Sequence, residues 1–93
     1  MSQSLATQRQ NDPILARFRS ALEGIFGDRI ERLVLFGSRA RGNARAVSDY
    51  DIAIFLHGLA DRRQEVRRMV PLVTDIIEET GAVIHPMPYP AGA

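Results

Sequence analysis

The amino-acid sequence predicts one small domain of the α/β (α+β) class, with about three strands and two long helices. Two stretches repeat apolar residues at the spacing of an amphipathic helix. Short apolar runs bounded by glycine, proline or polar residues indicate strands between and after these helices. The length of 93 residues suits one domain, which we expect to span residues 12–93. Residues 1–11 are polar and aperiodic, so we expect a flexible N-terminal tail.

The first helix is expected from Pro13 to Phe26. Asp12 precedes it as a capping side chain, and proline at the first helical position loses no hydrogen bond. Gly27 supplies a C-terminal stop. The apolar positions of this helix are Ile14, Leu15, Phe18, Leu22, Ile25 and Phe26.

Two strands are expected next, with an arginine-rich segment between them. The first covers residues 30–36 and ends in a continuous apolar run, which is typical of a strand covered on both faces. Gly37-Ser38 interrupts that run, and we expect the segment 39–47 to form a short helix or a loop. The second strand covers residues 49–56 and supplies further apolar surface.

The second long helix is expected over residues 62–80. Asp61 and Gln64 form a pattern typical of a capping box at its start, and Gly81 ends it. Pro71 lies inside the helix and predicts a kink or a break there. The apolar stripe of this helix comprises Val66, Met69, Val70, Val73, Ile76 and Ile77.

The third strand is expected over residues 82–88. Pro86, Pro88 and Pro90 alternate, so the N–H groups that they lack would all lie along one side of an extended chain. A side without donors cannot pair with another strand. We therefore expect an edge strand or one that stops early.

Composition excludes several classes of protein. No stretch approaches the ~18 apolar residues of a membrane span, and no basic start precedes an apolar run, so we expect no membrane segment and no signal peptide. The absence of cysteine excludes disulfides and thiolate metal sites, which suits the reducing cytoplasm. The net charge of +1 argues against a general nucleic-acid binder. All twelve basic residues are arginine, which reflects either codon bias or phosphate binding.

Gly37 and Ser38 directly follow an apolar strand. Glycine lets the backbone approach a ligand without a Cβ in the way. Backbone N–H groups at such a turn can hold a phosphate, and Ser38 adds a hydroxyl donor. Taken alone, the pair is more often an ordinary turn. The phosphate-binding patterns G-x-x-x-x-G-K and G-x-G-x-x-G do not occur.

Asp49 and Asp51 stand at the start of the second strand. Residues two apart in a strand face the same way, so the two carboxylates are expected to project together. Two like charges so placed raise each other's pKa unless a cation lies between them. Magnesium accepts carboxylate oxygens while it also binds substrate phosphates. The simpler alternative is a pair of solvated aspartates at the end of a strand.

Together, the segments 37–42 (GSRARG) and 48–55 (SDYDIAIF) closely resemble the signature of the polymerase-beta-like nucleotidyltransferases. The chain is most similar to the minimal, antitoxin-type branch of that superfamily. The resemblance is strong over about residues 33–55, while the flanking helices fit only the order of elements. It implies a nucleotidyltransferase-like fold, in which helices pack against a small mixed sheet.

The resemblance also implies roles for four residues. Gly37 and Ser38 would bind the nucleoside triphosphate, and the catalytic Asp49 and Asp51 would bind Mg²⁺, with Mn²⁺ as an alternative. An acceptor hydroxyl would attack the α-phosphorus, and pyrophosphate would leave. The metal would stabilise the attacking and leaving oxygens.

Three further residues have alternative interpretations. Arg39 and Arg41 either neutralise nucleotide phosphates or are ordinary solvated arginines. Many active relatives carry a third carboxylate on the next strand, but the stretch 82–87 contains no Asp or Glu. His85 is the only polar side chain there, and it is either a base or a half-exposed strand residue.

Two functions remain open at this stage. The first is metal-dependent transfer of a nucleoside monophosphate, expected to be AMP from ATP, to a hydroxyl of a protein or small molecule. The second is a catalytically weak or inactive antitoxin that binds a small helical toxin, which the short chain end after the third strand favours. An antibiotic-modifying enzyme would need a second domain. A homo-oligomer stays an open alternative to a monomer.

Overall fold

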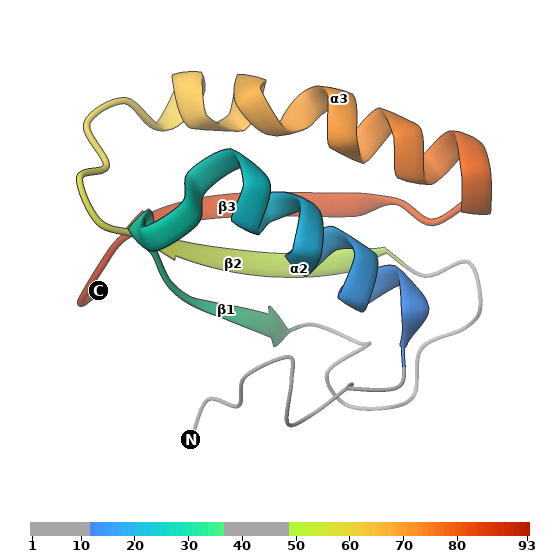
Figure 1. Ribbon diagram of the computed structural model, residues 1–93, viewed down its shortest axis with the longest axis horizontal. Coiled ribbons are helices and arrows are strands. Elements are labelled where there is room, and N and C mark those ends of the chain that lie inside the picture. The colour runs from blue at the N-terminus through green and yellow to red at the C-terminus, as the bar shows by residue number, and fades with distance from the viewer. Residues whose placement is uncertain (1–11, 37–48) are drawn as a thin grey trace.

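The computed structural model describes residues 12–36 and 49–93. In chain order these segments form α2 (Pro13–Phe26), the short 3-10 helix η1 (Gly27–Arg29), β1 (Ile30–Phe36), β2 (Tyr50–Leu56), α3 (Arg62–Thr80) and β3 (Ile84–Pro90). Figure 1 labels the α-helices and the strands. The predicted α+β class is confirmed. The expectations for residues 1–11 and 37–48 lie outside the described residues.

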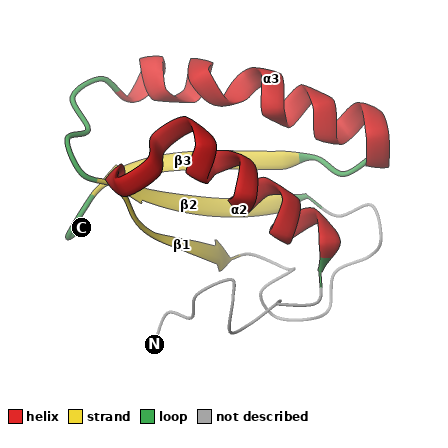
Figure 2. Ribbon diagram, in the orientation of Figure 1, coloured by secondary structure: helices red, strands yellow, loops and turns green. Residues whose placement is uncertain are grey.

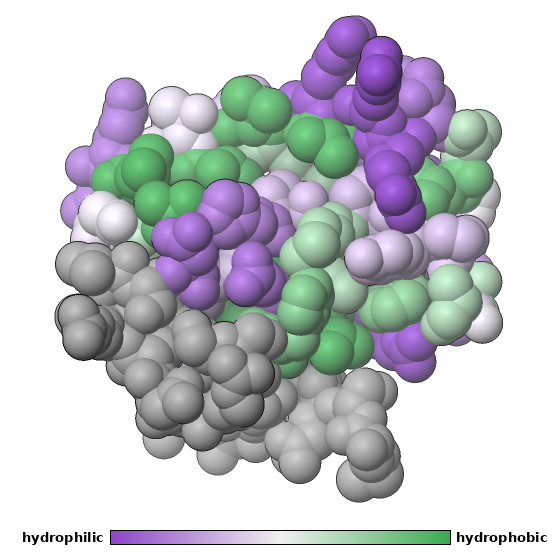
Figure 3. All heavy atoms as spheres, turned by 180° about the vertical axis from the view of Figure 1, so that it is seen from behind, coloured by the Kyte–Doolittle hydropathy of each residue, from purple (hydrophilic) through white to green (hydrophobic). Residues whose placement is uncertain are grey.

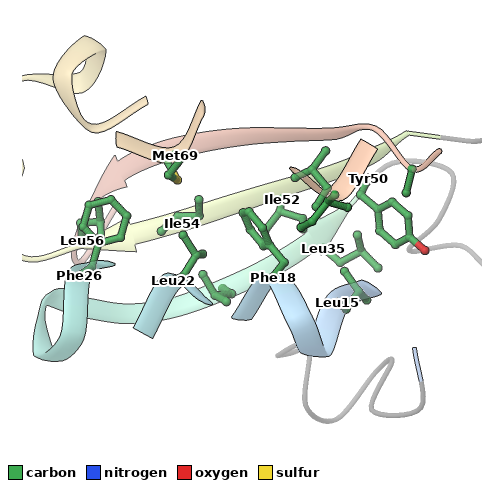
Figure 4. Close-up of a cluster of buried hydrophobic side chains, with 14 residues drawn as sticks. Leu15, Phe18, Leu22, Phe26, Leu35, Tyr50, Ile52, Ile54, Leu56 and Met69 are labelled. Carbon is green, nitrogen blue, oxygen red and sulfur yellow. The ribbon is translucent and has the colours of Figure 1, made fainter. Parts of the chain in front are cut away.

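The three strands form one mixed sheet in the order β1-β2-β3 (Figure 2). β1 runs antiparallel to β2, and β2 runs parallel to β3. The hydrophobic core lies between the helices and one face of this sheet (Figure 4). Alternate residues of β2 enter that core, namely Tyr50, Ile52, Ile54 and Leu56. The residues between them point to the other face of the sheet.

Helix α2 begins and ends as its capping pattern predicts. The Asp12 carboxylate accepts hydrogen bonds from the backbone N–H groups of Ile14, at 2.9 Å, and Leu15, at 3.3 Å. Gly27 closes the helix with a positive φ of 55°, which a residue with a Cβ rarely adopts. The face toward the sheet is buried and consists of Leu15, Phe18, Leu22 and Phe26.

Of the kink or break expected at Pro71, the break is wrong, because helix α3 is continuous from Arg62 to Thr80. Pro71 is exposed, and the carbonyl of Arg67 that loses its N–H partner therefore remains open to water. The helix begins at Asp61, whose side chain accepts from the Gln64 N–H at 3.3 Å. It ends at Gly81 in the left-handed region. No helix in the described ranges is long and apolar enough to cross a membrane.

The sequence-based limits of the last two strands need correction. β2 begins at Tyr50 rather than Asp49, and β3 spans Ile84–Pro90 rather than residues 82–88. Residue 83 nevertheless touches the ladder, because its carbonyl accepts from the Tyr50 N–H at 2.8 Å. At the other end, the Ala91 N–H donates to Leu56 O at 2.9 Å.

β3 is an edge strand, as its prolines predict, but it does not stop early. The backbone N–H and C=O groups of its odd-numbered residues point toward β2. The backbone groups of Pro86, Pro88 and Pro90 therefore point toward the outer edge of the sheet. Only the outer edge therefore lacks N–H donors, and pairing with β2 is intact. Arg62 covers part of this edge, where its Nε donates to Pro88 O at 3.0 Å.

Candidate active site

Asp49 and Asp51 lie where β2 begins. Tyr50, between them, is 2 % exposed and points into the core. Alternation along the strand therefore places the two aspartates on the side of the sheet that faces away from the helices. Asp51 is half-buried, whereas half of the Asp49 side chain is exposed. Carboxylate oxygens are thus accessible at this position, as a metal–nucleotide site requires.

The structure brings His85 to the same place. In the parallel pairing of β2 with β3, His85 is the partner of Asp51. Its Nε2 lies 2.7 Å from Asp49 Oδ2, and both side chains are about half exposed. The described structure therefore gathers Asp49, Asp51 and His85 at one end of the sheet. His85 is thus a half-exposed strand residue, which is one of the two interpretations given above. It also contacts Asp49, a candidate metal ligand.

The same end of the sheet receives the last residue of β1. Phe36 pairs with Asp51, so β1 ends beside the point where β2 and β3 begin. In Figure 1, β2 and β3 begin on the side of the molecule where α3 ends, and β1 points toward that side. Gly37, Ser38, Arg39 and Arg41 follow Phe36 in the sequence, and they lie outside the described residues. The described part shows only that the chain enters this segment next to Asp51.

An interaction that the sequence does not predict fixes the start of β2 against α2. The Tyr50 hydroxyl donates to Asp12 Oδ2 at 3.0 Å, while Asp12 Oδ1 caps the helix. A capping pattern identifies Asp12, but no sequence signal links it to a tyrosine 38 positions away. The backbone that carries the two aspartates is therefore tied to the helix layer from within the core.

Asp49 and Asp51 could hold a metal ion if water and substrate phosphates supplied its other ligands. Residues 12–36 and 49–93 contain no group of three or more His, Cys, Asp or Glu side chains placed to hold a metal. Magnesium is commonly held by one or two carboxylates together with water and substrate phosphates. Asp49 and Asp51 provide such a donor set, and their exposure leaves room for the other ligands.

A separate cavity of about 370 Å³ lies beside α2, η1 and β1. Charged side chains of both signs line it, including Arg19, Glu23, Asp28, Glu31 and Arg32. Neither Asp49, Asp51 nor His85 contributes to its wall. This mixture has no excess of cations for a triphosphate, so the cavity is a weaker candidate than the end of the sheet.

The family model described as "Polymerase beta, Nucleotidyltransferase" matches residues 22–85, from within α2 to His85. A protein of Methanocaldococcus jannaschii, named "Putative protein adenylyltransferase MJ1305", is 33% identical over 75 residues. That alignment covers 80% of this chain and 51% of the archaeal protein, so the chain spans about half the length of this relative. No solved structure matches the chain. The chain belongs to the polymerase-beta nucleotidyltransferase family.

Proposed function

We propose that this domain transfers AMP from ATP to a hydroxyl group of a protein, with Mg²⁺ or Mn²⁺ as the cofactor. The observation that carries the proposal is the position of Asp49 and Asp51 beside the end of β1. The family match supports nucleotidyl transfer as the type of reaction. The name of the archaeal relative supports a protein acceptor and adenylyl as the transferred group.

In the proposed reaction, one oxygen–phosphorus bond replaces another. The acceptor hydroxyl oxygen bonds to the α-phosphorus, and the bond to the bridging oxygen between the α- and β-phosphorus breaks. Pyrophosphate leaves with that electron pair, and the hydroxyl proton passes to solvent. Asp49 and Asp51 would hold the metal ion, which would neutralise charge that develops on the oxygens.

Other residues of the chain would bind and orient the nucleotide. The backbone N–H groups at Gly37 and the Ser38 hydroxyl are proposed to donate hydrogen bonds to the nucleotide phosphates. Arg39 and Arg41 are the proposed partners for the remaining phosphate charge, because a guanidinium donates two parallel hydrogen bonds to one phosphate. These four assignments rest on the sequence pattern.

The test uses ATP labelled at the α-phosphate, Mg²⁺ and a lysate of the source organism as a mixture of acceptor proteins. Wild-type protein is expected to label a protein band, and Asp49→Asn or Asp51→Asn should lower labelling by at least about 100-fold, since each replaces a charged carboxylate ligand with a neutral amide. Asp75→Asn is the matched control, because Asp75 is exposed on α3, which packs against the face of the sheet opposite the two aspartates.

Two results would contradict the proposal. Labelling that persists in both site variants would show that these aspartates do not carry the reaction. ATP binding without any transfer would instead favour the alternative, in which the domain is an inactive antitoxin that binds a helical toxin.

A further inference from the structure

We propose that His85 is a positioning residue for Asp49, which it holds through one carboxylate oxygen in the orientation that receives the metal. The inference rests on the proposed function, since it assigns a role within the same site. Its basis is the 2.7 Å contact between His85 Nε2 and Asp49 Oδ2, formed between the edge strand and the residue that precedes β2.

Asp49 needs such a support because it lies just outside the ladder. The pairing of β2 with β3 begins at Tyr50, whose N–H donates to Val83 O. Among the described residues, His85 is the one side chain that forms a hydrogen bond with Asp49. Half of the Asp49 side chain is exposed, so packing alone does not fix its rotamer. The hydrogen bond therefore restricts a carboxylate that would otherwise rotate freely.

The position of His85 is itself well determined. It pairs with Asp51 in the parallel ladder, and the residue after it is Pro86. A residue before proline is confined to extended conformations by contact with the proline ring. The backbone of His85 is thus held by the strand and by its neighbour, which fixes the point from which the imidazole reaches Asp49.

The chemistry of the pair assigns the proton. An ionised carboxylate only accepts hydrogen bonds, so Nε2 of His85 must carry the hydrogen that is donated to Asp49 Oδ2. No described residue forms a hydrogen bond with Oδ1 of Asp49, so the part of the chain in view leaves this oxygen available for a cation. Hydrogen-bonded partners of ligating carboxylates typically contribute about 10–100-fold to metal affinity or activity, because they fix the orientation of the ligand.

The first experiment measures the affinity of the protein for Mn²⁺ by electron paramagnetic resonance, in the presence of a non-hydrolysable ATP analogue. His85→Ala is expected to weaken Mn²⁺ binding by about 10-fold. His85→Gln should restore most of the affinity, since its amide N–H can take the place of Nε2–H. His57→Ala is the matched control, because His57 is exposed after the other end of β2.

Activity and spectroscopy separate this role from the alternatives. Saturating Mn²⁺ should return the kcat of His85→Ala to the wild-type value if His85 only positions Asp49. A kcat that stays low and is not rescued by glutamine would show a base and overturn the proposal. Hyperfine coupling between Mn²⁺ and a His85 nitrogen would show a direct ligand and would also overturn it.

A second experiment needs neither metal nor turnover. Long-range ¹H–¹⁵N spectra of the imidazole should show His85 protonated at Nε2, and Asp49→Ala should shift its ring signals, whereas Asp75→Ala should not. Unchanged ring signals in Asp49→Ala would refute the contact.

If Asp49→Ala abolishes Mn²⁺ binding while His85→Ala does not weaken it, the proposed function stands and this inference fails. If neither Asp49→Ala nor Asp51→Ala affects metal binding or transfer, the proposed function itself fails.

Discussion

At the scale of single residues, Asp12 links the two structural layers of the domain. One of its oxygens caps α2, and the other accepts from the Tyr50 hydroxyl at the start of β2. The sequence alone identifies Asp12 only as a helix cap. It gives no sign of the hydrogen bond to Tyr50, which spans 38 positions. The candidate metal ligands on either side of Tyr50 therefore depend on a residue that is not itself part of the site.

Replacement of Asp12 by alanine is expected to lower the free energy of unfolding by about 2 kcal/mol. Loss of a helix N-cap costs about 1 kcal/mol, and loss of a side-chain hydrogen bond costs about as much again. Asp12→Ser should keep the cap and lose only the bond to Tyr50, so its cost should be about half. Urea denaturation measures both values. An Asp12→Ser variant as stable as the wild type would show that the bond to Tyr50 contributes nothing.

At the scale of elements, an ion pair between a half-buried arginine and a buried glutamate joins η1 to α3. Glu65 of α3 is 6 % exposed, and Arg29 of η1 reaches its carboxylate. Arg29 also donates to the carbonyls of His57 and Gly58, which lead from β2 to α3. Arg68 lies 3.4 Å from the second Glu65 oxygen, a separation that allows charge attraction without a well-formed hydrogen bond. One arginine thus holds three consecutive parts of the chain together.

Arg29→Ala is expected to destabilise the domain by about 3 kcal/mol, because it leaves the Glu65 carboxylate buried without its closest cation. Arg29→Ala combined with Glu65→Leu should recover part of that loss, since no buried charge remains. Thermal or urea unfolding of both variants gives the comparison. A double variant that is less stable than the single one would contradict this explanation.

The elements also show how far local sequence patterns determine the structure. The limits of α2 and β1 are predicted correctly, because capping residues and apolar spacing act within a few positions. β3 is displaced by two residues from its expected limits, since its prolines affect only the outer edge, and which edge is outer depends on tertiary pairing. The contact of His85 with Asp49 depends on the parallel pairing of β2 with β3, and no local pattern specifies that pairing.

At the scale of the whole molecule, helices cover one face of the sheet and the candidate site lies at the end of the other face. Figure 3 shows the molecule from behind, with hydrophobic and hydrophilic residues intermixed on this side. Phe55 and Tyr89 stack there at 5.5 Å, and Arg32 lies 4.0 Å above the Phe55 ring. These contacts lie toward the end of β2 opposite Asp51, so these side chains do not cover the candidate site.

The most direct test of the site is an NMR titration of ¹⁵N-labelled protein with ATP, with and without Mg²⁺. We expect amide shifts that require Mg²⁺ and cluster at Phe36, Asp49, Asp51 and His85, together with the sequence-predicted Gly37 and Ser38. Asp49→Ala should abolish them. Shifts confined to the cavity beside α2 and β1, around Arg19 and Glu31, would contradict the assignment of the nucleotide site to this end of the sheet.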